Sequence, residues 1–262
     1  MKSRRWAVPS CTLLLASALA FPPNSAWAQS EPAPDPAAGE EAAPEKNWSL
    51  EVGADFANHY LFRGVELLND EGVLVPRAVL SVGNWAFAYY GYAGDITPGR
   101  GKYRENDLTA DYTFALGNMS LTTGALTYMF NGDAEDQLAF FDTYEVYAIA
   151  SWDVAGAPTV SYYHDVDQVD GGYLQAGVSH EFALGEQVAL SLSGAVGLDF
   201  GYNSSGSSGD LNDALIGLDL SWAPTDALSM HALVQRSIAL DVLDDIGQDD
   251  LTVTTVGLSY TF

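Results

Sequence analysis

Segments in which apolar and polar residues alternate recur about every 18 residues along most of the chain. The last of them places Val256, Leu258 and Phe262 on one face and small or polar residues on the other. Successive side chains of a β-strand point to opposite faces, so this pattern predicts strands with one apolar and one polar face. Twelve such segments are found, at 48–62, 74–82, 85–94, 105–114, 119–130, 141–152, 158–165, 172–182, 188–200, 211–222, 227–237 and 250–262.

Strands that are apolar outward and polar or small inward are what a barrel in lipid with a wet lumen requires. The number of predicted strands is even, as it is in single-chain bacterial barrels. The connections between the strands alternate between short and long. We therefore expect 48–262 to form an all-β, antiparallel, up-and-down transmembrane β-barrel with short periplasmic turns and longer extracellular loops. A secreted β-sandwich also has short alternating strands, but it explains neither the even number nor the alternating connections.

The N-terminal residues predict export. Lys2, Arg4 and Arg5 precede a short apolar run, and Ala26-Trp27-Ala28 forms a small-x-small cleavage site. Residues 1–28 are therefore expected to be a Sec signal peptide, with an apolar run too short to span a bilayer. Residues 29–47 are rich in Pro, Ala and Glu and are expected to be a disordered periplasmic leader.

The C-terminal aromatic residue predicts the destination. An alternating strand that ends on Phe262 resembles the signal read by the outer-membrane assembly machinery of Gram-negative bacteria. The expected partners are that machinery, outer-membrane lipid with lipopolysaccharide, and small solutes. The sequence gives no signal for an oligomeric state or for a particular solute.

Charge and cysteine usage exclude several classes of function. Removing three basic residues with the signal peptide changes the net charge from −25 to −28, which should repel nucleic acid. The only cysteine, Cys11, leaves with the same segment, so thiolate metal or redox chemistry is not expected. The loops 165–171 and 244–250 carry carboxylates that suit hard cations, but they lack the EF-hand spacing. We interpret them as solvated loops, and we expect no metal and no cofactor.

Aromatic residues should form girdles at the two membrane interfaces. The four tryptophans that follow the signal peptide fall at the expected periplasmic rim, together with three other aromatic residues: Trp48, Trp85, Trp152, Trp222, Phe182, Tyr260 and Phe262. The outer girdle is expected to contain Tyr60, Phe62, Tyr128, Phe130 and Phe200.

The inward faces of the predicted strands are mostly small and acidic. The expected lumenal carboxylates are Glu51, Asp55, Asp107, Asp111, Glu145, Glu181, Asp199, Asp213 and Asp219. Arg63 and Arg77 are the basic residues on these faces, and the first hairpin should bring them to similar heights near the outer mouth. They could form a charged constriction whose transverse field orients solutes, or an ion-pair network that plugs and stiffens a narrow barrel.

Three functions are compatible with this barrel. The first is a channel for passive diffusion of small hydrophilic solutes or ions, with a cation preference that the acidic lumen would favour. The second is a plugged structural or adhesion barrel without conductance, and the third is an outer-membrane lipid hydrolase. Ser229 and His231 share a lumenal face, and His164 has no serine beside it on the lipid side. No catalytic triad can be assembled, so we do not expect an enzyme.

The segment 54–66 resembles the first strand of the TorF family of Gram-negative outer-membrane porins. The residues that match its Phe-Arg-Gly signature are Tyr60, Phe62, Arg63 and Gly64, and Glu66 stands where that family usually has serine. The resemblance implies an outer-membrane barrel that acts as a porin.

Overall fold

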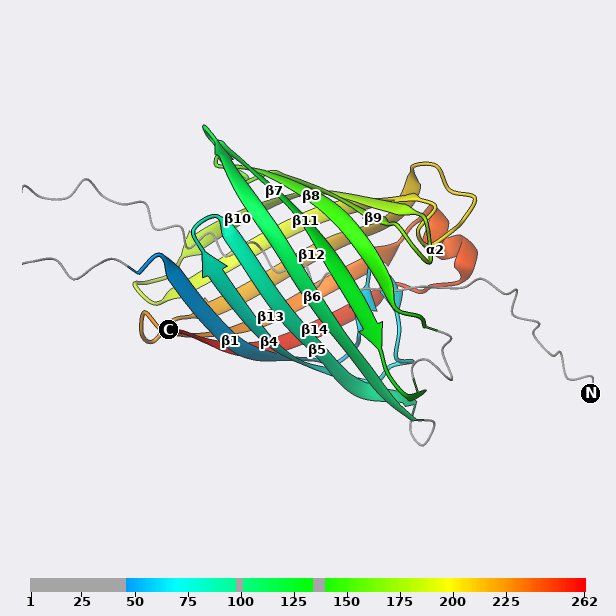
Figure 1. Ribbon diagram of the computed structural model, residues 1–262, viewed down its shortest axis with the longest axis horizontal. Helices are drawn as coiled ribbons and strands as arrows, with labels where there is room; N and C mark the ends of the chain where they lie inside the picture. The colour runs from blue at the N-terminus through cyan, green and yellow to red at the C-terminus, as the bar shows by residue number, and fades with distance from the viewer. Residues whose placement is uncertain (1–45, 98–100, 134–139) are drawn as a thin grey trace, which may run out of the picture.

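The computed structural model describes residues 46–97, 101–133 and 140–262, and its strands form a closed antiparallel barrel (Figure 1). The predicted signal peptide and nearly all of the predicted leader lie outside these ranges. The twelve barrel strands are β1 Trp48–Ala57, β4 Val73–Val82, β5 Trp85–Thr97, β6 Gly101–Leu116, β7 Met119–Phe130, β8 Thr143–Trp152, β9 Thr159–Asp165, β10 Gly172–Ala183, β11 Val188–Phe200, β12 Asp210–Trp222, β13 Leu228–Ala239 and β14 Leu251–Thr261.

Each barrel strand pairs with its neighbours in sequence, and β1 closes the barrel against β14. Val52 marks the closure, because it lies opposite Ala78 of β4 on one side and Tyr260 of β14 on the other. The predicted twelve-stranded, up-and-down antiparallel barrel is therefore confirmed. The connections also alternate in length, and we call the two ends of the barrel the short-turn end and the long-loop end.

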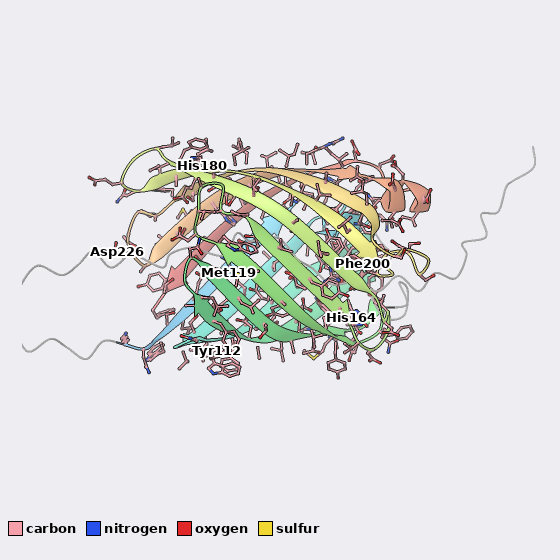
Figure 2. All side chains as sticks on the ribbon, turned by 90° about the horizontal axis from the view of Figure 1, so that it is seen from above. Tyr112, Met119, His164, His180, Phe200 and Asp226 are labelled. Atoms are coloured by element: carbon pink, nitrogen blue, oxygen red, sulfur yellow. The ribbon has the colours of Figure 1, made fainter. Side chains whose placement is uncertain are left out.

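The outer surface of the barrel is apolar. Along β1 the exposed residues Trp48, Val52 and Phe56 alternate with more buried ones, and the same alternation recurs around the barrel. Side chains project outward along its whole length in Figure 2. A continuous apolar belt on a closed barrel is the surface that lipid requires.

The expected short-turn girdle is present. Trp48, Trp85 and Trp222 are 43 to 49% exposed, and Phe182, Tyr260 and Phe262 are exposed at the same end. Trp152 lies at the end of β8 and is half-buried. Phe200 is exposed at the long-loop end, as expected, and lies near His164 in Figure 2.

The first strand is shorter than predicted, because the chain leaves the barrel wall at Asn58. The Asn58 side-chain oxygen accepts the backbone N–H of Thr254 at 2.7 Å, and this side chain ends the pairing of β1 with β14. Residues 58–72, which we call the plug hairpin, then fold into the lumen and contain the short strands β2 Leu61–Phe62 and β3 Val65–Glu66. Ala57 and Val73 face each other across β1 and β4, so the wall is continuous without the hairpin.

Four of the five residues expected in the outer girdle lie inside the barrel instead. Tyr60 and Phe62 belong to the plug hairpin and are 0% and 1% exposed. Tyr128 and Phe130 lie on the inward face of β7 and are equally buried. These predictions were wrong because the plug hairpin makes the long-loop half of the lumen a packed protein core, in which Tyr60 stacks on Tyr92 at 5.1 Å.

The second long loop was also predicted wrongly, since 95–104 is largely strand. Asp95 of β5 pairs with Lys102 of β6, and residues 98–100 lie outside the described residues. The last long connection contains a helix that the sequence did not predict, α2 Asp241–Ile246, whose Val242 and Leu243 are buried. Figure 1 shows α2 at the end of the barrel opposite the C-terminus. Within the described ranges, no helix is long and apolar enough to cross a membrane.

The tip of the plug hairpin depends on Gly64. Its φ is 83°, and a Cβ there would overlap Leu243 Cδ1 of α2 and approach Asp213 Cβ to 3.0 Å. We expect Gly64→Ala to weaken the docking of the hairpin by about 1–2 kcal/mol from the left-handed backbone alone. Tryptic cleavage after Arg63, which is buried in the docked hairpin, should increase accordingly.

Gly117→Ala is the matched control for this substitution. Gly117 has a φ of 69° in a short turn, and a Cβ there would meet no atom within 4 Å. This variant should carry similar backbone strain but leave Arg63 protected. Equal protection of Arg63 in both variants would show that the fit of Gly64 against α2 does not hold the hairpin.

Candidate functional site

The lumen has two halves that differ in their access to solvent. Near the short turns the inward side chains are small and half-buried, and we call this half the vestibule; its lining includes Ser49, Ser81, Thr113, Thr122, Ser151, Ser191 and Ser221. Near the long loops the inward side chains are fully covered, and Glu145 and Asp165 are both 0% exposed. Solvent therefore reaches the inward side chains of the vestibule, whereas the plug hairpin fills the long-loop half of the lumen.

An ion cluster lies midway along the strands, where the vestibule meets the plugged half. Arg77 of β4 forms an ion pair with Asp55 of β1 and donates from Nε to Glu51 at 3.3 Å. His231 of β13 places Nε2 3.2 Å from Asp55 Oδ1 and Nδ1 3.9 Å from Asp219 Oδ2. Asp55 is 0% exposed, whereas its partners are 11 to 18% exposed. Water from the vestibule thus reaches the edge of this cluster but not its central carboxylate.

A second ion pair joins the plug hairpin to the barrel wall. Arg63 Nη1 and Nη2 donate to the two Glu145 oxygens at 2.8 and 2.7 Å, and Tyr128 Oη donates to Glu145 Oε2 at 2.8 Å. The two charged side chains are 1% and 0% exposed. Burial lowers the pKa of Arg63, but the Glu145 carboxylate together with Tyr202 and Tyr128 outweighs this effect and holds that pKa above the ordinary value. The pair is therefore a fully desolvated, charged, bidentate contact.

Aromatic rings surround the Arg63 guanidinium. Its central carbon lies 4.0 Å from the ring centroid of Tyr202, 4.6 Å from that of Phe62, 4.9 Å from that of Tyr163 and 5.3 Å from that of Tyr173. All four distances are within the range of a cation–π interaction.

Further polar contacts hold the hairpin in the lumen. Tyr60 Oη donates to Glu105 Oε2 of β6 at 2.7 Å. The Arg63 carbonyl oxygen accepts from Asn212 Nδ2 at 2.8 Å and from Asn203 Nδ2 at 3.3 Å. The hairpin is thus tied to several strands of the wall through side chains.

The carboxylates expected in the lumen all point into the barrel or its mouth, but in different environments. Those in the plugged half and at the ion cluster are buried: Asp55, Asp107, Glu145, Asp199 and Asp213. Glu51, Asp111 and Asp219 are partly exposed, and Glu181 is exposed near the short turns. Whether these side chains line a solute path stays a prediction.

Several of these carboxylates have structural partners that the sequence did not reveal. Asp111 accepts from Tyr147 Oη at 2.9 Å, and Asp213 accepts from Tyr173 Oη at 2.8 Å. Asp199 accepts the backbone N–H of Asn203 at 2.7 Å and so shapes the following loop.

Arg63 and Arg77 belong to separate clusters. Arg63 lies in the plug hairpin rather than at the end of the first strand, and it contacts Glu145. Arg77 contacts Glu51 and Asp55. The two arginines therefore do not form one constriction ring in this structure, and their substitutions should have separable effects.

The histidines and acidic loops have other surroundings. His164 stacks on Tyr162 and places Nε2 3.7 Å from Asp170. Asp165, in the first acidic loop, accepts the backbone N–H of Asp167 and of Val169 at 3.0 Å. Among the described residues, no three His, Cys, Asp or Glu side chains come together as a metal site.

A closed antiparallel barrel of twelve strands with an apolar exterior and a polar interior is the architecture of the transmembrane β-barrels. The amino-acid sequence of this protein matches no family model and no curated protein.

Solved structures share the fold. The KdgM porin aligns with a TM-score of 0.51 at 11% identity, over 82% of this chain and 99% of its own. The NanC porin aligns with a TM-score of 0.50 at 13% identity, over 80% and 98%. The COG4313 outer membrane channel from Pseudomonas putida F1 aligns with a TM-score of 0.52 at 10% identity, over 87% and 100%. Similarity at this level of identity establishes the fold and not the solute.

Proposed function

We propose that this protein is an outer-membrane channel for passive diffusion of small hydrophilic solutes, and that the plug hairpin closes its outer half. The observation that carries the proposal is the contrast between an apolar exterior and a solvent-accessible vestibule lined by small hydroxylated side chains. Porins and a channel share the fold, and the segment around Arg63 and Gly64 resembles the TorF-family porins. The proposal places the barrel in the outer membrane, surrounded by lipid and lipopolysaccharide, with its short turns facing the periplasm. The assembly machinery would read Phe262 as its signal.

The plug hairpin is built so that it can leave the lumen. Ala57 and Val73 pair directly, so the pairing of β1 with β4 does not depend on the hairpin, and Asn58 at its start bonds to Thr254 of β14 at the rim. Its central contact with the wall is a buried ion pair, which usually adds less stability than apolar packing of the same volume. Once the hairpin moves out, Arg63 and Glu145 can both be hydrated, which lowers the free energy cost of separating them.

The charge of the lumen favours cations and neutral solutes over anions. Its interior carries many more carboxylates than basic side chains, and a low-dielectric wall focuses the field of those charges. A KdgM structure is described in complex with disordered oligogalacturonate. The acidic lumen of this chain favours a solute that is not anionic.

The test is planar-bilayer conductance of the wild type and of a variant in which 58–72 is replaced by an Asn-Gly turn, which suits a two-residue connection between paired strands. We expect small or brief currents from the wild type and large, persistent, cation-preferring currents from the variant. Heat-modifiable gel migration serves as the control for folding. A variant that is folded but does not conduct would contradict the proposal and favour a structural barrel.

A further inference from the structure

We infer that the lumenal wall around Glu145 is a binding site for organic cations that carry a guanidinium or ammonium group, and that Arg63 occupies it as an internal ligand when the channel is closed. The inference rests on the proposed channel function and names the class of solute that such a channel would select. Opening and solute binding would then be coupled, because the solute and Arg63 compete for one site.

Most of the site remains on the wall when the hairpin leaves. Glu145 lies on β8, Tyr128 on β7, Tyr163 on β9 and Tyr173 on β10. Tyr202 follows β11, on the connection to β12. Only Phe62, among the rings around the guanidinium, belongs to the hairpin itself.

The chemistry of the wall matches a flat or tetrahedral organic cation. Glu145 is fully buried and offers two oxygens to a bidentate donor, while Tyr128 donates to one of them and keeps the carboxylate in place. The ring of Tyr202 lies 4.0 Å from the bound guanidinium carbon. A buried carboxylate combined with several aromatic faces is the arrangement by which proteins recognise guanidinium and alkylammonium groups.

A small cavity adjoins the site. It has a volume of about 20 Å³, close to one water molecule, and its lining includes Arg63, Tyr163 and Tyr173 together with the apolar residues Leu61, Leu215 and Val253. Gln175 and Gln235 add polar groups to this mostly apolar wall, which suits the alkyl part of an organic cation better than a small inorganic ion. Arg77, in contrast, is held by two carboxylates at the edge of the vestibule and lies in a different environment.

The inference can be tested by removing the internal ligand and supplying a free one. In Arg63→Ala, methylguanidinium at low millimolar concentration should reduce the current and raise the unfolding temperature. Urea, which is planar but neutral, should need a concentration at least about tenfold higher for the same effect. Arg63→Ala combined with Glu145→Gln should lose the response to methylguanidinium, because the carboxylate that pairs with the cation is gone.

Solute class is tested separately in liposomes. With 58–72 replaced by the Asn-Gly turn, arginine should enter faster than citrulline, a neutral amino acid of nearly the same size. Glu145→Gln should reduce this difference more than Asp111→Asn, which removes a lumenal carboxylate away from the site. Equal rates without either substitution would overturn the inference while leaving the channel function intact.

Measuring the unfolding temperature with methylguanidinium tests the cation site separately from the channel function. If no variant conducts, the channel function fails, and a methylguanidinium-dependent stabilisation of Arg63→Ala would still support the site. If Arg63→Ala conducts, but methylguanidinium neither reduces its current nor raises its unfolding temperature, the inferred cation site does not exist. Arg63 would then only hold the plug hairpin in the lumen.

Discussion

Glu145→Ala should release the plug hairpin and convert a mostly closed channel into an open one. The substitution leaves the Arg63 guanidinium, now 1% exposed, without its bidentate partner in a desolvated place. Loss of one member of a buried pair costs about 3–5 kcal/mol, which would raise the ratio of open to closed channels by roughly two to three and a half powers of ten. Single-channel recording should show the change as a higher open probability, and trypsin should now cleave after Arg63.

Arg63→Met combined with Glu145→Met and Tyr128→Phe is the matched control. Two apolar side chains of similar volume remove both charges, and such replacements of buried ion pairs are often neutral or stabilising. Tyr128→Phe is included because the Tyr128 hydroxyl would otherwise lose its buried acceptor. The triple variant should therefore remain closed and should resist unfolding at least as well as the wild type. If Glu145→Ala keeps the wild-type open probability, the ion pair does not hold the hairpin in the lumen.

The barrel could be predicted from the sequence because each strand has one face in lipid and one in the lumen. Val52 and Phe56 cannot exchange faces with Glu51 and Asp55 without placing carboxylates in lipid, so the alternation fixes the phase of β1. The same constraint placed the lumenal carboxylates on the correct faces of their strands.

The plug hairpin could not be predicted in this way. Alternation continues through Tyr60 and Phe62, and an aromatic residue that faces lipid has the same sequence pattern as one that packs against a plug. Once the hairpin fills the lumen, Tyr128 and Phe130 are apolar residues on an inward face. At this end of β7 both faces carry apolar residues, so the alternation no longer fixes the phase of the strand.

The partners of the two arginines were hidden for a related reason. Arg63 and Glu145 are 82 residues apart, and only the inward fold of the hairpin brings them together. The tyrosines around Arg63 come from β9, β10 and the loop after β11, so no local pattern contains them. Arg63 also has a positive φ of 45°, which the turn of the hairpin requires. A sequence does not mark such a conformation at a residue other than glycine, so the turn could not be recognised.

Arg77→Met should destabilise the barrel without opening the plug. Asp55 is 0% exposed, and without Arg77 the nearest remaining basic side chain is His231, whose Nε2 lies 3.2 Å away. An uncompensated buried carboxylate costs about 3 kcal/mol or more, so the unfolding temperature in the gel assay should fall by several degrees. The loss of one lumenal positive charge should also raise the ratio of cation to anion permeability, by roughly a factor of a few at low salt.

Two controls decide whether the Asp55 charge is the cause. Asp55→Asn in the Arg77→Met background should restore most of the lost stability, because it removes the unpaired charge and keeps the shape of the side chain. Arg236→Met should change the stability by less than about 1 kcal/mol, because Arg236 and its partner Asp250 are 45% and 43% exposed and their pair is solvated. If Arg77→Met unfolds at the wild-type temperature, water from the vestibule must already solvate Asp55, and the ion cluster would tune selectivity without stabilising the barrel.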